Sequence, residues 1–102
     1  MLRVSNMVSD ASGREIANQF IIKNDNKTMF QSYQSPIVEI DWTNQTLTVY
    51  PNWNYSMTTG KYRNMFMRDN RFYDMADKSG FASCLKNGKT MCGYSEFIVK
   101  MA

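Results

Sequence analysis

The sequence predicts an α+β domain in which an antiparallel meander of three to four short strands carries one or two helices and a C-terminal strand. Short segments rich in β-branched and aromatic residues alternate with turn residues over the first fifty positions. From Ser56 onward the apolar spacing becomes that of a helix. A length of 102 residues with 43% hydrophobic residues suits one modest core. We therefore expect residues 1–102 to form a single domain.

The strands are expected where apolar residues cluster between turn-forming segments. The expected segments are Ala17–Lys23, Thr28–Tyr33, Pro36–Trp42 and Leu47–Tyr50, and Met1–Val8 is either a short first strand or an extended lead-in. Short polar segments rich in Ser, Asp, Asn and Thr separate them and favour chain reversal. Pro36 has no N–H to donate, so it predicts an edge, a bulge or a break at that point.

A helix is expected from Ser56 to Arg71, after the polar aromatic connector Pro51–Tyr55. Ser56 can cap it, because its hydroxyl accepts a hydrogen bond from an unpaired N–H of the first turn. At about 100° per residue, the apolar residues of this segment share one side. These residues are Tyr62, Met65 and Phe66.

A second helical segment is expected from Arg71 to Lys86, with Gly80 as a point at which it could divide. The Asn-Gly-Lys sequence at 87–89 is a helix stop signal. Met91–Met101 is then expected to end the chain as one strand packed on the sheet.

Another side of the first helix carries polar side chains that are mostly basic. These residues are Lys61, Asn64, Arg68 and Arg71. Residues 61–102 carry eight Lys/Arg against four acids, whereas residues 1–60 carry four against five, so the net charge of +3 comes from the second part. Such a stripe can bind phosphate groups. The alternative is the solvated face that every amphipathic helix requires.

Aromatic residues gather around the connector before this helix. They are Trp42, Tyr50, Trp53, Tyr55 and Tyr62. Exposed rings could stack on bases or anchor a protein interface, whereas buried rings would form the core where the helix crosses the sheet. We expect Trp53 and Tyr55 to be the exposed pair, because asparagine flanks them.

Catalytic chemistry has little support. The chain contains no histidine, which removes the commonest general base and metal ligand. The acidic pair Glu39 and Asp41 fits the solvent side of a strand as well as a metal site. We expect no enzyme, no catalytic residue, no metal and no cofactor. No export signal or membrane span is expected, so Cys84 and Cys92 are expected to be free thiols.

Three motifs carry a family resemblance. They are GREIANQFII at Gly13–Ile22, FQSYQS at Phe30–Ser35 and WNYSMTTGKYRNMF at Trp53–Phe66. Together they resemble a family of small uncharacterised proteins encoded by bacteriophages and prophages, over the region from about residue 6 to Arg68. The sequence departs from the family pattern beyond Arg68. The resemblance implies a phage origin and a location in the cytoplasm of an infected host, and it supplies no catalytic or binding residue.

Three functions are compatible with these observations. The first is a non-catalytic binder of a host protein or ribonucleoprotein complex, including an inhibitor of a bacterial defence system of the anti-CRISPR kind, with residues 53–71 as its contact surface. The second is a nucleic-acid binder that uses Lys61, Arg68 and Arg71, with Trp53 and Tyr55 as stacking platforms. The third is a structural virion component with strand edges at both termini. The oligomeric state stays open.

Overall fold

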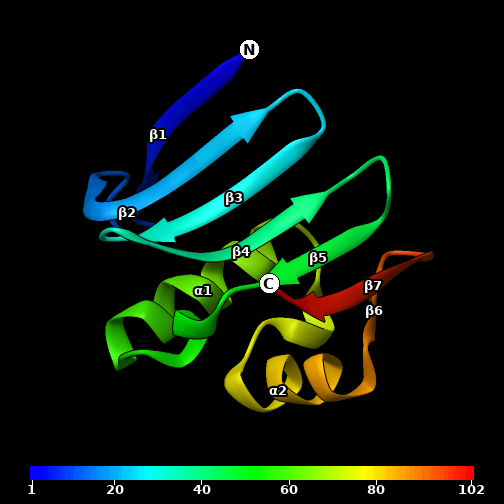
Figure 1. The fold of residues 1–102 in the computed structure, drawn as a ribbon. Coiled ribbons are helices and arrows are strands. Elements are labelled where there is room, and N and C mark those ends of the chain that lie inside the picture. Colours follow the sequence, from blue (N-terminus) through cyan, green and yellow to red (C-terminus); the bar gives the residue numbers. More distant parts are fainter.

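The computed structural model describes residues 1–102 and contains one seven-stranded sheet with two α-helices on one of its faces (Figure 1). The strands are β1 (Leu2–Val8), β2 (Glu15–Asn24), β3 (Lys27–Ser32), β4 (Ser35–Asp41), β5 (Thr46–Val49), β6 (Lys89–Cys92) and β7 (Ser95–Met101). The helices are η1 (Pro51–Asn54), α1 (Met57–Asp69), η2 (Tyr73–Met75) and α2 (Lys78–Asn87), where η denotes a 3₁₀ turn. The α+β class is therefore confirmed, with more strands than the sequence predicted.

The first five strands form the expected antiparallel meander, each paired with the next along the chain. Pro36 lies at a β-bulge. Phe30 pairs with Val38 and Gln31 with Pro36, so Ile37 has no partner in β3. Ile37 and Val38 are both fully buried, although they are neighbours on one strand. The bulge that the proline predicted thus adds an inward-facing side chain to the core.

The second helix starts later than expected. Helix α1 ends at Asp69, and Arg71 adopts a φ of 69°, a left-handed conformation that stops the helix. Helix α2 begins only at Lys78, where the Asp77 carboxylate accepts a hydrogen bond of 2.6 Å from the N–H of Gly80. Gly80 does not divide the helix: a Cβ at this position would overlap the carbonyl oxygen of Asp74, so glycine allows η2 to approach α2.

The predicted C-terminal strand is confirmed as β7, but it begins at Ser95 and not at Met91, and it forms a hairpin with the additional strand β6. Gly93, with a φ of 61°, forms the turn between β6 and β7. Strand β7 lies between β5 and β6 and runs parallel to β5, the only parallel pair in the sheet. The sheet edges are therefore β1 and β6, and the C-terminal strand is internal. An edge at both termini, as expected for a virion component, is thus found only at the N-terminus.

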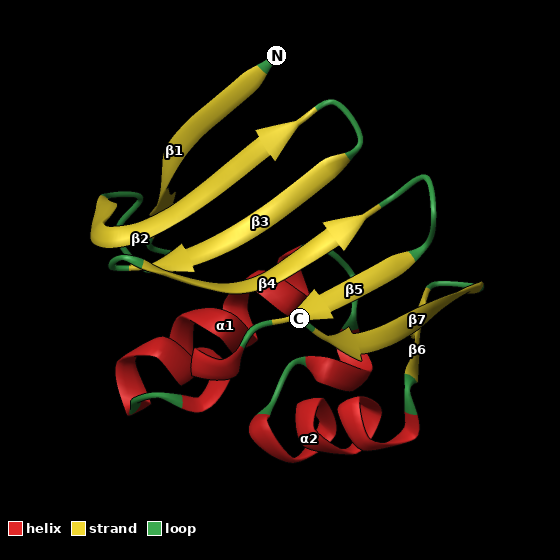
Figure 2. Cartoon of the chain, in the orientation of Figure 1, coloured by secondary structure: helices red, strands yellow, loops and turns green.

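The core lies between the inner sheet face and the helices, which Figure 2 shows together on one side of the sheet. Aromatic pairs join the layers. The ring centroids of Phe30 on β3 and Phe66 on α1 lie 5.7 Å apart, and those of Phe72 and Phe97 lie 5.1 Å apart. Phe66 and Met65 are buried and Tyr62 is partly buried, which confirms the predicted apolar side of α1.

Neither α1 nor α2 is long and apolar enough to cross a membrane. Cys84 and Cys92 are both free thiols, as predicted.

Candidate functional site

The start of helix α1 is fixed to the sheet by a chain of hydroxyl groups. The Ser56 Oγ accepts a hydrogen bond of 3.1 Å from the N–H of Thr59, which confirms the predicted cap. The buried Thr59 hydroxyl in turn lies 3.0 Å from the Ser32 hydroxyl on β3. This anchored end projects two large side chains into solvent, since Tyr55 is 77% exposed and Met57 is 94% exposed. With the neighbouring exposed Lys61 they form a surface that we name the α1 tip.

The predicted polar face of α1 exists, but it is shorter and less charged than expected. Lys61, Asn64 and Arg68 line one shallow hollow of about 280 Å³ beside the β1–β2 turn. Arg68 is paired there with Asp10 at 3.0 Å, an exposed ion pair. Asn64 is partly buried, and its Oδ1 accepts a hydrogen bond from Arg63. Lys61 forms no ion pair, so it is the member of the face whose charge is uncompensated.

Two predicted contact residues lie elsewhere. Trp53 is half-buried and stacks on Phe81 of α2, with ring centroids 5.0 Å apart and an interplanar angle of 20°. It is a packing residue, because α2 folds back over η1 and covers the ring that its asparagine neighbours suggested was exposed. Arg71 lies beyond the end of α1 in the left-handed turn, so it cannot extend the helical stripe. Tyr55 is exposed as predicted.

The sequence reasoning missed Arg63, which is only 1% exposed. Its Nη1 donates to the Trp53 carbonyl oxygen and its Nη2 to Asn64 Oδ1, both at 2.8 Å, while Nε has no partner. Its guanidinium carbon lies 4.9 Å from the ring centroid of Phe81 and 5.3 Å from that of Trp53. Burial lowers its pKa, and the charge of Asp77 opposes that shift. Arg63 lies four residues from Thr59 and from Met67, which are both buried. This helical spacing could have predicted that its side chain points inward.

Arg63 also lines a second hollow, which we name the α1–α2 notch. This hollow has a volume of about 480 Å³. Its lining residues are Asn54, Ser56, Met57, Gly60, Lys61, Arg63, Asn64 and Lys78. Three of them are cations and none is an acid. The stretch from Trp42 to Arg68 contains no Asp or Glu, a pattern that could have drawn attention to it. Lys78 is added from α2 and was not predicted.

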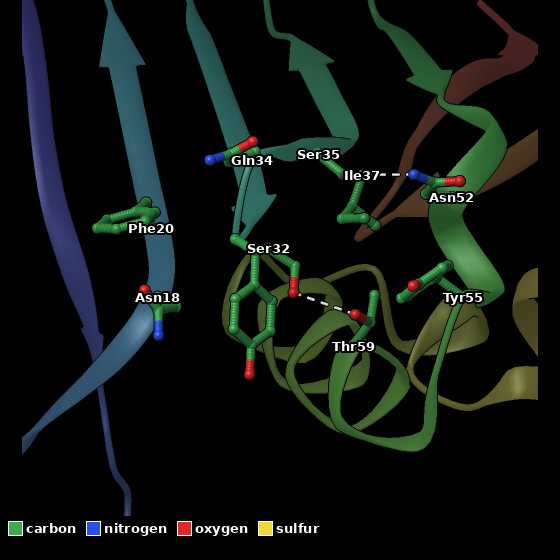
Figure 3. Close-up of a pocket in the computed structure, with 10 residues that line it drawn as sticks. Asn18, Phe20, Ser32, Gln34, Ser35, Ile37, Asn52, Tyr55 and Thr59 are labelled. Atoms are coloured by element: carbon green, nitrogen blue, oxygen red, sulfur yellow. Dashed lines mark hydrogen bonds between the residues drawn. The ribbon is translucent and has the colours of Figure 1, made fainter.

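The largest of these hollows has Tyr55 and Thr59 in its lining and a volume of about 770 Å³ (Figure 3). We name it the Tyr55 hollow. It is lined by Asn18, Phe20, Ser32, Tyr33, Gln34, Ser35, Ile37, Asn52, Tyr55 and Thr59. None of these side chains is charged. The amide of Asn52 donates to the Ser35 hydroxyl at 3.0 Å. Aromatic rings beside amide and hydroxyl groups suit contacts with neutral polar groups.

The acidic side chains do not form a cluster that could serve as a metal site. No group of three or more His, Cys, Asp or Glu residues is close enough together to hold a metal ion. Asp41 accepts hydrogen bonds of 2.9 Å from both the backbone N–H and the side-chain amide of Asn44, which lower its pKa. Its carboxylate therefore stabilises the turn between β4 and β5.

The single mostly antiparallel sheet, the helices on one face and the exposed α1 tip define a small α+β protein with a candidate contact surface. Residues 3–83 match the profile of a family of unknown function, DUF8033, and the chain belongs to that family. The match continues beyond Arg68, where the motif resemblance ended, and reaches into α2. No curated protein and no solved structure matches the chain.

Proposed function

We propose that this protein is a non-catalytic, phage-encoded binder that acts in the cytoplasm of an infected bacterium. It contacts a host protein or ribonucleoprotein complex and blocks that target's own contacts, as an inhibitor of a bacterial defence system would. The contact surface is the α1 tip. The observation that carries the proposal is the exposure of Tyr55 and Met57, two residues apart in the chain, at 77% and 94%, each at the lining of a hollow.

The chemistry of the α1 tip supports this role. Tyrosine is enriched among the residues that dominate binding energy at protein interfaces, and methionine adapts its shape to varied partners. The Tyr55 hollow and the α1–α2 notch can each receive a side chain of the partner. The hydroxyl chain from Ser56 through Thr59 to Ser32 keeps the tip in place. A pre-positioned surface loses little conformational entropy on binding.

Affinity capture from lysate of the bacterial host, with quantitative mass spectrometry, tests the proposal. The wild-type chain should enrich a specific host complex, and the double variant Tyr55→Ala, Met57→Ala should lose it. Tyr94→Ala is the matched control, because Tyr94 is a fully exposed tyrosine on the distant β6–β7 turn. A complex retained by the double variant would contradict the α1 tip as contact surface, and turnover of any substrate would contradict a non-catalytic role.

Nucleic-acid binding is the second candidate, favoured by the absence of acids between Trp42 and Arg68 beside the cations of α1. Lys61, Arg68 and Tyr55 stay in this candidate surface and Lys78 joins it. Trp53 and Arg71 leave it, because Trp53 packs on Phe81 and Arg71 lies beyond the end of α1. Fluorescence polarisation with single- and double-stranded oligonucleotides distinguishes it from the first proposal, since binding to phosphates weakens steeply with salt.

A role as a structural virion component is the third candidate. The observation in its favour is the unpaired edge of β1, which carries the exposed side chains of Leu2, Val4 and Val8. Such an edge can pair with a strand of another subunit. Detection of the protein in purified particles by mass spectrometry would support this candidate over the others.

A further inference from the structure

We infer that the α1–α2 notch is a binding site for a single phosphate monoester group, a ligand that the proposed function does not require. The notch brings together Lys61 from the outer face of α1, Arg63 from its inner side and Lys78 from the start of α2. No acidic side chain lines it. Its volume of about 480 Å³ is within the range of small-ligand sites.

Arg63 places a buried positive charge at the notch. Its side chain is 1% exposed and forms no ion pair with any carboxylate. The charge of Asp77 raises the pKa of Arg63, but the two form no ion pair, and the Asp77 carboxylate caps α2 by accepting the N–H of Gly80. A buried charge without a counter-ion is costly to a fold. An anion in the notch would supply that missing charge.

Access to this charge depends on Gly60. A Cβ at position 60 would lie 3.8 Å from both Nη1 and Nη2 of Arg63, which is ordinary van der Waals contact. An alanine therefore fits without a clash, and its methyl group would contact the guanidinium where both residues line the notch. Glycine is a poor choice inside a helix, where it costs about 1 kcal/mol against alanine. The bare backbone at this position leaves the field of the guanidinium open toward the notch.

The remaining groups favour phosphate. Lys61 and Lys78 are both exposed, and ammonium groups bind phosphate as point charges. Ser56 and Met57 place the N-terminus of the 13-residue helix α1 on the same hollow, where the helix dipole favours an anion. A phosphate monoester carries nearly two negative charges at about pH 7, which matches several positive groups better than one carboxylate does.

Titration of the labelled protein with inorganic phosphate, followed by NMR at low ionic strength, tests the inference. The amide signals of residues around the notch should shift and saturate. Lys78→Gln should weaken the affinity by about tenfold, the loss of one charge-assisted contact. Gly60→Ala should also weaken it while raising the thermal midpoint, because the methyl contacts Arg63 and improves the helix. Lys86→Gln, in the last turn of α2, is the matched control and should leave binding unchanged.

The source of the phosphate is tested with two oligonucleotides of one sequence, one with a 5′-phosphate and one with a 5′-hydroxyl. Preference for the phosphorylated end would assign the site to nucleic-acid ends, and binding of inorganic phosphate without that preference would assign it to small phosphates. No saturable phosphate binding would overturn the inference, as would unchanged binding by the double variant Gly60→Ala, Lys78→Gln. Equal or tighter binding of a glutamate-rich peptide would overturn the preference for phosphate. Tyr55→Ala should bind phosphate normally, so the outcome is separate from that of host-protein capture.

Discussion

The Nη1 of Arg63 donates a hydrogen bond of 2.8 Å to the backbone carbonyl oxygen of Trp53, and this contact joins α1 to the connector before it. The same guanidinium lies 5.3 Å from the Trp53 ring centroid. One side chain therefore holds both the backbone and the ring of a residue ten positions earlier. The α1 tip lies between these two residues in the sequence, so its orientation depends on this contact.

The substitution Arg63→Lys should lower the free energy of unfolding by about 2 kcal/mol, because one ammonium cannot reach both acceptors and leaves a partly buried oxygen unpaired. Arg68→Lys, the same change at an exposed site on the same helix, should stay within about 0.5 kcal/mol. Urea denaturation monitored by circular dichroism measures both. Equal effects would show that the contact of Arg63 with Trp53 contributes little.

The two aromatic residues predicted to be exposed should behave differently. Trp53→Ala should cost about 3 kcal/mol of stability, since it removes a ring stacked on Phe81. Tyr55→Ala should change stability by less than about 0.5 kcal/mol, since its side chain is 77% exposed. Thermal unfolding of both variants beside the wild type is the measurement. A stable Trp53→Ala variant would contradict the packing role of this ring.

Replacing the two helical glycines by alanine should change the stability of the protein in opposite directions. Gly80→Ala should lower stability by about 1–3 kcal/mol, because the new methyl group overlaps the Asp74 carbonyl and forces η2 away from α2. Gly60→Ala should raise stability by about 0.5–1 kcal/mol, because its methyl group fits. Chemical denaturation of the pair is a matched comparison. If both substitutions stabilise the protein, η2 can move away from α2 without a loss of stability, which would contradict this prediction.

Removal of the α1 cap should destabilise the protein. Ser56→Ala leaves the N–H of Thr59 without its acceptor and should cost about 1 kcal/mol. Ser79→Ala, at an exposed position in the first turn of α2, is the control. Hydrogen exchange of the first α1 turn offers a local measurement, in which faster exchange in Ser56→Ala alone is the expected result.

Stability should decline in acid partly through Asp41. Its hydrogen bonds from Asn44 hold its pKa below the ordinary value of 3.8 in the folded protein. Because the folded-state pKa is the lower one, the carboxylate stabilises the fold above pH 3.8, and this contribution is lost as the pH falls through the folded-state value. Asp41→Asn should therefore show a smaller loss of urea midpoint between about pH 5 and about pH 3 than the wild type. Glu96→Gln is the control, because it removes one negative charge at an exposed position.

The sequence predicted those parts of the fold that depend on neighbours along the chain. Alternating apolar residues predicted an antiparallel meander, although of three to four strands where the structure has five. Pro36 predicted an edge, a bulge or a break, and the structure has a bulge. Ser56 predicted where α1 begins. Helical periodicity also placed Lys61, Asn64 and Arg68 on one face, and Tyr55 was correctly expected outside. The parallel pairing of β7 with β5 was missed, because strand pairing across about fifty residues leaves no local pattern. The β6–β7 hairpin was also missed, although it is local and Gly93 at its turn is a signal that could have revealed it.

What the sequence by itself determined was the α+β class, the apolar side of α1 and its polar face, since these follow from the spacing of residues within single elements. The tertiary structure alone decided that Trp53 is covered and that cations of two helices meet. Helix α2 folds over η1, so it partly covers Trp53 and places Phe81 beside Arg63, and it brings Lys78 to the same notch as Lys61. These contacts join elements distant in the sequence, and residue spacing within one element carries no information about them.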